Sequence, residues 1–235
     1  LFVKNIYESL QKDFLIDKIV CFKQDSKVYK LINYIMFYAK VFFKVLFFSY
    51  DYIFIHYISH SSLPIILAKK INPDLFIISN IHGNDLVPED KKDEKMLKYS
   101  IKILKISNYV IVPSKYFKDI LISNFNFDQN RIQVIPSGGI NTEIFSINNR
   151  QPILSNSKIV FGFVSRIEIN KGWDTYLVLA KELIKEYSNL HFIIVGQGKE
   201  LVNMKHKIKE YGLDSFISYF HFMSQKDLAK LYKKI

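Results

Sequence analysis

Two cationic side chains follow one apolar run of the sequence closely. Arg166 stands at the end of the run KIVFGFVS, and Lys171 lies in the turn that follows, just before Gly172. A guanidinium fork and an ammonium group that converge on one point are suited to binding a diphosphate. They can also neutralise the charge that develops on a departing phosphate. The alternative is an ordinary charged surface loop, which spacing by itself favours.

A histidine stands at a comparable point in the first half of the chain. His82 follows the apolar run LFIISNI and precedes a Gly-Asn-Asp turn that ends at Asp85. An imidazole there can donate a hydrogen bond to a sugar hydroxyl or take part in proton transfer. The competing interpretation is a histidine whose partners are backbone groups. Asp85 can orient His82 or cap a neighbouring helix, and capping is the commoner role.

Glycines follow two further apolar runs, in SGG and in GQG. Gly138 and Gly139 permit either close approach of a ligand or a turn with positive φ, and a turn is the default. Gly196 and Gly198 resemble part of a dinucleotide-binding fingerprint, but Leu201 stands where the third glycine belongs. The sequence therefore disfavours a nicotinamide-dependent enzyme.

Short apolar runs alternate with helical patterns along the chain, which predicts an α/β fold with parallel sheets. We expect strands at 15–22, 51–56, 75–81, 108–114, 131–136, 158–165, 191–198 and 216–222. Ser61 and Ser62 are expected to cap the helix after the second run, with Pro64 in its first turn. Ligands of such sheets bind where strands end.

The polar segment 141–158 predicts a linker between two domains. We therefore expect two Rossmann-like domains, residues 1–145 and 146–235, the second incomplete.

The chain of 235 residues has a formal net charge of +11, and only three of its cationic residues are arginines. Such a surface favours anionic partners, but readout of nucleic-acid bases relies on arginine, so nucleic acid is disfavoured. The single cysteine, Cys21, indicates a reducing compartment and hence a cytoplasmic location. The six histidines are scattered, and no metal-ligand motif is evident, so no metal is expected.

An aromatic-rich segment, residues 31–48, predicts a long helix. Lys40 and Lys44 interrupt its apolar character, which argues against a membrane span. Together with Asn33 they form one polar stripe, which favours a helix buried on its apolar side. The alternative is a helix lying on an anionic membrane surface, which would place the protein peripherally on the inner face of the plasma membrane.

Several segments together resemble one known family. They are IPSGGINTEIF (135–145), FGFVSRIEINKGWDTYLVLAKEL (161–183) and the stretch from HFIIVGQGKEL to the chain end, with weaker likeness in IHGND and NYVIVPSKYFKDIL. Each is modest alone, but their order and spacing over residues 50–235 resemble glycosyltransferase family 4, a group of retaining enzymes with the GT-B fold.

The resemblance implies a two-domain enzyme that moves a sugar from a nucleotide-sugar donor to a glycan or lipid-linked acceptor, for example in surface polysaccharide synthesis. The first domain would lie on the acceptor side. Arg166 and Lys171 match the basic pair that binds the donor diphosphate without a metal or cofactor, and His82 matches a histidine of the sugar site; these three are the catalytic candidates. The remaining donor-binding residues that it implies are Gly138, Gly139, Gly196, Gly198, Phe222 and Met223.

The sequence also departs from the family pattern. Ser137 replaces the usual Asn, Asn141 the usual Asp, and His221 stands where glycine is common. A first strand with a glycine-rich loop is expected before Leu1, and an acidic motif with a pair of glutamates after Ile235. We therefore expect an internal portion of the enzyme, inactive by itself. The alternatives are a GT-B-fold nucleotide-sugar epimerase and a non-catalytic basic module that binds membranes.

Overall fold

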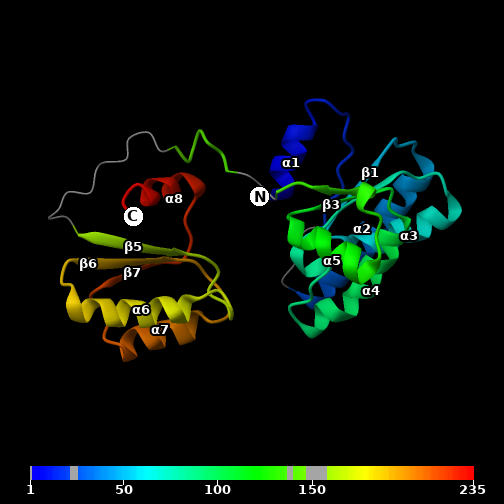
Figure 1. The fold of residues 1–235 in the computed structure, drawn as a ribbon. Helices are drawn as coiled ribbons and strands as arrows, with labels where there is room; N and C mark the ends of the chain where they lie inside the picture. Colours follow the sequence, from blue (N-terminus) through cyan, green and yellow to red (C-terminus); the bar gives the residue numbers. More distant parts are fainter. Residues whose placement is uncertain (1, 22–25, 137–139, 147–157) are drawn as a thin grey trace. The chain divides into compact units, whose positions relative to one another are not determined.

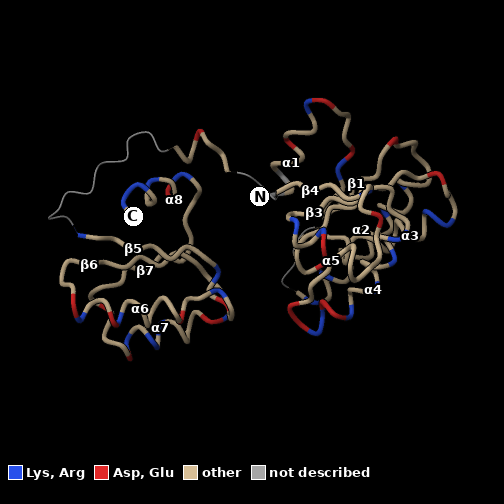
Figure 2. The backbone as a smooth tube through the Cα atoms, in the orientation of Figure 1, with Lys and Arg blue, Asp and Glu red and all other residues tan. Residues whose placement is uncertain are grey.

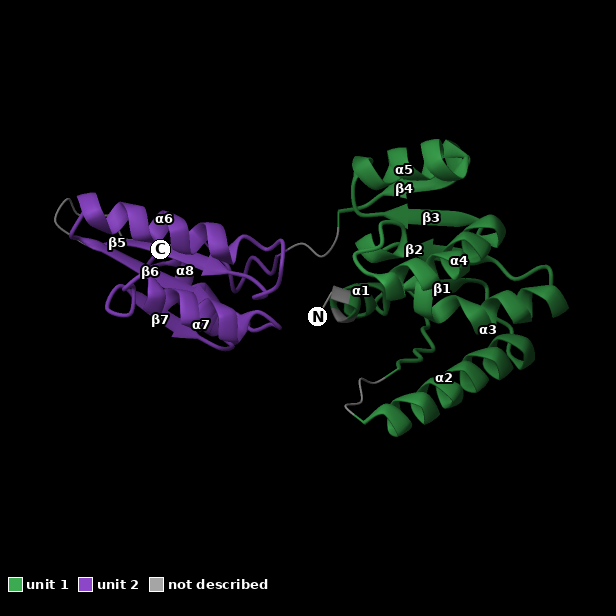
Figure 3. Ribbon diagram, turned by 90° about the horizontal axis from the view of Figure 1, so that it is seen from below, with its two compact units in different colours: residues 1–139 green, residues 140–235 purple. Residues whose placement is uncertain are grey.

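The computed structural model describes residues 2–21, 26–136, 140–146 and 158–235. The chain forms two compact units, residues 1–139 and 140–235, each with its own parallel sheet (Figures 1 and 3). The boundary predicted after residue 145 lies a few residues further along the chain. The alternation of strands and helices that the sequence predicted is confirmed in both units.

The sheet of the first unit has four parallel strands in the order β1-β2-β3-β4. The strands are β1 (Ile53–His56), β2 (Ile77–Asn80), β3 (Tyr109–Val112) and β4 (Ile132–Val134). The helices are α1 (Phe2–Leu10), α2 (Lys27–Phe47), α3 (Ile58–Ile71), α4 (Lys91–Ile106) and α5 (Lys115–Phe125), with short 3-10 turns η1 (Gly83–Asp85) and η2 (Gln129–Arg131). Fully buried Ile77, Val110 and Val112 alternate with less buried neighbours and form the centre of the core.

The sheet of the second unit has three parallel strands in the order β5-β6-β7. They are β5 (Ile159–Val164), β6 (Leu190–Val195) and β7 (Ile217–Phe220), and the helices are α6 (Trp173–Glu186), α7 (Leu201–Glu210) and α8 (Gln225–Tyr232). Figure 1 shows α6 and α7 on one face of this sheet and α8 on the other. Within this unit, Phe192 and Ile194 point to the apolar core on the side of α6 and α7. Ile193 and Val195 point to the opposite face, where they pack with Leu231 of α8, as the period of two along a strand requires.

One predicted strand, residues 15–22, is wrong for its described part. Residues 15–21 are irregular and do not join the sheet, and the side chains of Leu15 and Val20 are exposed. Side-chain contacts hold this segment instead: the Asp17 carboxylate accepts hydrogen bonds from Lys44 and from the Tyr50 hydroxyl. The partners of Asp17 lie 27 and 33 positions away in the sequence, so the local apolar pattern did not indicate that polar contacts would hold this segment.

The predicted cap of α3 is also wrong. The helix begins at Ile58, so Ser61 and Ser62 lie inside its first turns rather than at its start. The capping group comes from η1, where an Asp85 carboxylate oxygen accepts the backbone N–H of Ser59 at 2.9 Å. A cap from a residue 26 positions away leaves no local pattern that reasoning from neighbouring residues can detect.

Proline in α3 explains how α2 is held. Pro64 has no N–H, so the carbonyl of His60, one turn earlier, loses its usual helical donor. The hydroxyl of Tyr38 in α2 donates to that carbonyl at 2.7 Å. Figure 3 shows α2 beside α3, with α4 on the other side of α3. The helix expected at 31–48 is thus present, but one of its apolar sides is exposed rather than buried: within α2 only Val41 and Val45 are buried.

Candidate functional site

The first candidate site lies where β1 and β2 end, in the first unit. The register places His56 beside Asn80, the last residues of the two strands, and His82 follows as the residue before η1. One oxygen of Asp85 accepts from the His82 backbone N–H at 2.8 Å, while the other caps α3 through Ser59. Because Asp85 is only 2% exposed, this carboxylate fixes the backbone of the site from inside the fold.

The rings of His56, Tyr57 and His82 lie close together at the ends of β1 and β2. The His82 Nε2 atom lies 3.4 Å from Nδ1 of His56, and the amide nitrogen of Asn80 lies 3.4 Å from the same Nδ1 atom. The Tyr57 ring stacks on the His82 ring with centroids 4.1 Å apart. Tyr57 has a φ of 52°, in the left-handed region that non-glycine residues seldom adopt. The turn that holds this ring against His82 is therefore specified by tertiary contacts.

Burial keeps both histidines neutral near pH 7. Burial and, to a smaller extent, the neighbouring His82 together lower the pKa of His56 to about 4. Burial also lowers the pKa of His82, against the opposing influence of the Asp85 carboxylate. A neutral imidazole can donate at one nitrogen and accept at the other. His82 is accordingly suited to hydrogen bonding with hydroxyl groups rather than to binding an anion.

The second candidate site lies between β5 and α6, in the second unit. The Arg166 guanidinium forms an ion pair with Glu168, Nη1 to Oε2 at 3.0 Å, and the Arg166 side chain is 61% exposed. Asn170 and Gly172 have φ values of 66° and 80°, so the predicted tight turn before α6 is confirmed. Lys171 lies between these two residues, and its backbone N–H donates to the Glu168 carbonyl at 3.2 Å.

Two glycines let the neighbouring loop pack directly against this turn. A Cβ atom on Gly196 would lie 1.8 Å from the Ser165 carbonyl oxygen, and one on Gly198 would lie 2.1 Å from that of Ile167. The Ile167 N–H donates to the Gln197 carbonyl at 3.0 Å, which holds the two loops together. Gly196 and Gly198 therefore have a steric role that the sequence prediction did not include, and their contact with a donor stays a prediction.

The three strand ends of the second unit lie at one edge of its sheet. The register pairs Val164 with Val195 and Val195 with Phe220, so the residues after each strand start from neighbouring positions. Phe222, after β7, is 76% exposed. Met223 instead packs partly against the apolar cluster under α8. Gly138 and Gly139, also predicted at the donor site, lie outside the described residues.

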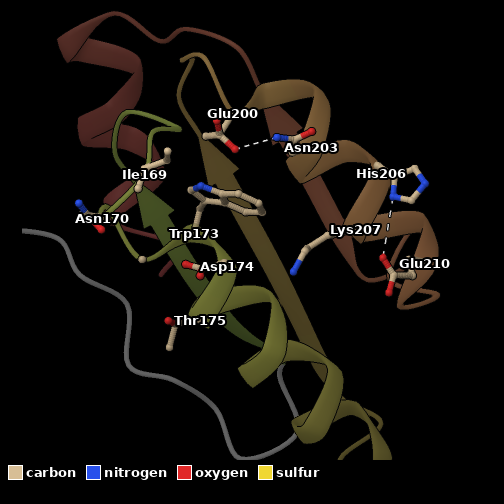
Figure 4. Close-up of a pocket in the computed structure, with 11 residues that line it drawn as sticks. Ile169, Asn170, Trp173, Asp174, Thr175, Glu200, Asn203, His206, Lys207 and Glu210 are labelled. Carbon is tan, nitrogen blue, oxygen red and sulfur yellow. Dashed lines mark hydrogen bonds and ion pairs between the residues drawn. The ribbon is translucent and has the colours of Figure 1, made fainter. Parts of the chain in front are cut away.

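A pocket of about 800 Å³ lies between the start of α6 and α7 (Figure 4). Its lining comprises Ile169, Asn170, Gly172, Trp173, Asp174, Thr175, Glu200, Asn203, His206, Lys207 and Glu210. Carboxylates are prominent there: Glu200 accepts from Asn203, and Glu210 pairs with His206 at 3.8 Å. Neither Arg166 nor Lys171 is among the described residues that line it, and this acidic character does not suit a diphosphate.

Sequence reasoning placed His82, Arg166 and Lys171 just after strands, and His56 as the last residue of the predicted strand 51–56, but missed three neighbours. Asn80 and Tyr57 stand directly beside predicted strand ends, which is the signal that would have found them. Glu168 is the third, since a carboxylate two residues from Arg166 is a ready ion-pair partner. In the described part of the chain, no group of three or more His, Cys, Asp or Glu residues lies close enough to hold a metal ion.

Comparison with known proteins gives the family. The model described as "Glycosyltransferase Family 4" matches residues 18–143, and that described as "Glycosyl transferases group 1" matches residues 145–235. The first match covers more than half of the chain, and the chain belongs to Glycosyltransferase Family 4.

Individual relatives are distant. Mannosylfructose-phosphate synthase of Agrobacterium fabrum is 22% identical, over 60% of this chain and 34% of that protein. HepE of Anabaena, solved in complex with UDP and glucose, is 18% identical with a TM-score of 0.65, over 98% of this chain and 61% of HepE. Sucrose-phosphate synthase of Thermosynechococcus elongatus is 17% identical with a TM-score of 0.65, over 91% of this chain and 55% of that one. The GT-B-like fold expected from the sequence is thereby confirmed.

Proposed function

We propose that the protein transfers a sugar from a nucleotide-sugar donor to an acceptor hydroxyl. The observation that carries the proposal is the position of two cations after the end of β5, the exposed Arg166 and the half-buried Lys171, in a chain that belongs to Glycosyltransferase Family 4. HepE, which shares the fold, was solved with UDP and glucose. Because the chain spans between 34% and 61% of the length of the three relatives named above, the reaction is proposed for the protein as a whole.

The two cations would bind the donor diphosphate. As the bond between the anomeric carbon and the diphosphate breaks, charge builds on the leaving phosphate oxygens. Arg166 can offer a planar fork to those oxygens and Lys171 a mobile point charge. No metal or cofactor is then required by this proposal, since the same charge neutralisation comes from side chains.

His82 would bind a hydroxyl of the transferred sugar. Its ring is held by Tyr57 and His56 and stays neutral near pH 7, so it can donate or accept one hydrogen bond without competing for the diphosphate. Donor binding by Gly138, Gly139, Gly196, Gly198, Phe222 and Met223 is part of the same proposal. So is transfer with retention to a glycan or lipid-linked acceptor in surface polysaccharide synthesis.

We also place the protein in the cytoplasm and against the inner face of the plasma membrane. The support is a net charge of +11, which favours association with anionic lipid headgroups. Figure 2 shows lysine and arginine positions spread over both units. No helix in the described part of the chain is long and apolar enough to cross a membrane.

Donor binding is tested by calorimetric titration of this chain with UDP. Arg166→Ala and Lys171→Ala are each expected to weaken binding about tenfold or more, because each removes a charge-assisted contact to phosphate. Lys185→Ala, which removes a lysine paired with Glu182 on α6, is the matched control and should leave affinity unchanged. Undiminished affinity in both Arg166→Ala and Lys171→Ala would remove these residues from the donor site.

Turnover is tested by incubating the protein with a nucleotide sugar and an acceptor. NMR of the product made from an α-linked nucleotide sugar should show an α-glycosidic bond if transfer proceeds with retention. Conversion of the nucleotide sugar to its epimer without any acceptor would instead support the epimerase alternative and contradict the transfer reaction.

A further inference from the structure

The outward face of α2 is apolar along its whole length. Side chains at helical spacing, each between 46% and 76% exposed, form the stripe, which we call the α2 face: Val28, Ile32, Ile35, Met36, Phe43 and Phe47. The Phe43 and Phe47 rings stack on each other with centroids 6.0 Å apart. A stripe of this size on one helix is unusual on the surface of a soluble domain and indicates a binding surface.

The opposite side of α2 fixes which face points outward. Val41 and Val45 are buried in the core of the first unit, and the Tyr38 hydroxyl donates to the His60 carbonyl of α3 at 2.7 Å. The Lys44 ammonium forms an ion pair with the Asp17 carboxylate, which also links α2 to the segment 15–21. The helix therefore cannot roll to bury the α2 face without breaking these contacts.

The charge of α2 is entirely positive. The helix contains Lys27, Lys30, Lys40 and Lys44 and no Asp or Glu. Lys27, Lys30 and Lys40 are exposed. Lys40 lies next to Phe47 and Met36 around the helix, at the margin of the apolar stripe, whereas Lys27 and Lys30 lie on the side of Val41 and Val45. A stripe with a lysine at its margin, on a helix of net positive charge, is complementary to a bilayer whose headgroups are anionic, because rings and aliphatic chains enter the acyl boundary while the ammonium group meets phosphate.

We propose that the α2 face docks the protein on an anionic bilayer, with the helix lying in the plane of the interface. The inference rests on the membrane location proposed above and is independent of the donor chemistry. The 21 residues of α2 extend about 31 Å at 1.5 Å per residue, which gives a long, shallow contact. Tyr38 and Val41, on the inward side, would keep the membrane-bound helix attached to α3 and to the core of the first unit.

A second copy of the chain is a poorer occupant of the same surface. In a symmetric dimer formed through the α2 face, Lys40 of both helices would lie at the interface, and neither helix has a carboxylate to pair with it. Repulsion of like charges opposes such an interface, whereas anionic lipid relieves it. Charge complementarity thus selects the bilayer.

Vesicle flotation tests the proposal on this chain. We expect binding to vesicles of phosphatidylcholine with added phosphatidylglycerol and little binding to phosphatidylcholine alone. The combined variant Ile32→Gln, Met36→Gln and Phe43→Gln should bind at least about tenfold more weakly, because three apolar side chains no longer enter the bilayer. These side chains are exposed, so the fold should be kept, which circular dichroism verifies.

The matched control replaces exposed apolar residues of the second unit, Val178→Gln, Leu179→Gln and Val202→Gln. Their loss should leave vesicle binding unchanged. A second variant of α2, Lys40→Ala, removes the exposed lysine beside the stripe and should lower the preference for anionic vesicles by about fivefold at low salt. Equal binding of the glutamine variant of α2 and the unaltered chain would overturn the proposal.

Depth of contact gives an independent readout. In Phe43→Trp, lipids brominated along the acyl chain should quench the new indole, while Trp173, 6% exposed in the second unit, serves as the internal reference. No quenching beyond that of the unaltered chain would overturn the proposal. So would light scattering that shows a dimer which the glutamine variant converts to a monomer. Donor binding measured by calorimetry is unaffected by either result, so failure here is separate from failure of the proposed transfer.

Discussion

The two candidate sites lie at equivalent points of two parallel sheets, yet they are built differently. In the first unit, His82 is enclosed by His56 and Tyr57, and its backbone is held by the buried Asp85. In the second unit, Arg166 is 61% exposed and held by one ion pair with Glu168. The first site is formed before any ligand arrives, whereas the Arg166 guanidinium of the second is largely in contact with solvent.

The difference follows from what each site is proposed to bind. A hydroxyl gives weak, directional hydrogen bonds, so its partner must be positioned in advance. A diphosphate attracts cations over several ångströms, and flexible side chains can adjust to it. Changes in the first unit should accordingly affect stability first, and changes around Arg166 should affect binding with little loss of stability.

The largest effect is expected from Asp85→Ala. The substitution leaves the backbone N–H groups of Ser59 and His82 without their acceptor inside the fold, which should lower the free energy of unfolding by about 3 kcal/mol. Urea denaturation followed by circular dichroism measures it. Asp74→Ala, at an exposed site, is the control and should change stability by less than about 0.5 kcal/mol. Equal stability of both variants would contradict a preformed first site.

A smaller loss is expected in the second unit from Gly198→Ala. The new methyl group would lie 2.1 Å from the Ile167 carbonyl oxygen, so the two loops must separate, at a cost of about 2 kcal/mol. Trp173, in the core of this unit, reports its unfolding by fluorescence. Gly83→Ala is the control, because its Cβ would make only an ordinary contact, 3.5 Å from the Phe117 ring. A neutral Gly198→Ala would show that the loops do not depend on this close approach.

Lowering the pH should reduce the stability of the first unit, because burial favours the neutral form of His56. Its pKa is lowered from 6.5 to about 4 in the folded chain, so between these values the unfolded chain binds a proton that the folded chain does not. The free energy of unfolding should therefore fall as the pH is lowered from 6.5 towards 4. His56→Asn should reduce this slope without abolishing it, since burial also lowers the pKa of His60 and His82. An unchanged slope, matching that of the exposed-site control His206→Asn, would contradict the burial of His56.

The smallest effect on stability is expected from Glu168→Gln. Arg166 is exposed and Glu168 is only half-buried, so removal of the pair should change the free energy of unfolding by less than about 1 kcal/mol. Affinity for UDP should rise by about twofold to fivefold, because the guanidinium no longer has to leave a carboxylate. Asp174→Asn, on a nearby carboxylate of α6, serves as the control in the same titration. A large loss of stability in Glu168→Gln would show that the second site is preformed too.

Local patterns predicted what depends on local interactions. The alternation of apolar runs placed His82, Arg166 and Lys171 after strands, and the turn at Gly172 followed from its neighbours in sequence. Contacts between distant residues escaped prediction. The polar tie of Asp17 to Lys44 explains why residues 15–21 are not a strand, and the cap supplied by Asp85 explains why α3 starts before Ser61. Periodicity cannot distinguish two apolar sides of one helix, which is why the sequence favoured burial for residues 31–48 and gave a surface helix only as the alternative, whereas one apolar side of α2 is exposed.

Pro64 has a consequence for how the first unit opens. Helix α3 lacks one donor of its own, and a tyrosine of α2 supplies it, so α3 completes its hydrogen bonding only while α2 is docked. Detaching α2 would leave the His60 carbonyl without that partner as well as exposing Val41 and Val45. The backbone amides of the two helices should then exchange with solvent as one cooperative segment, rather than as two helices that fray separately.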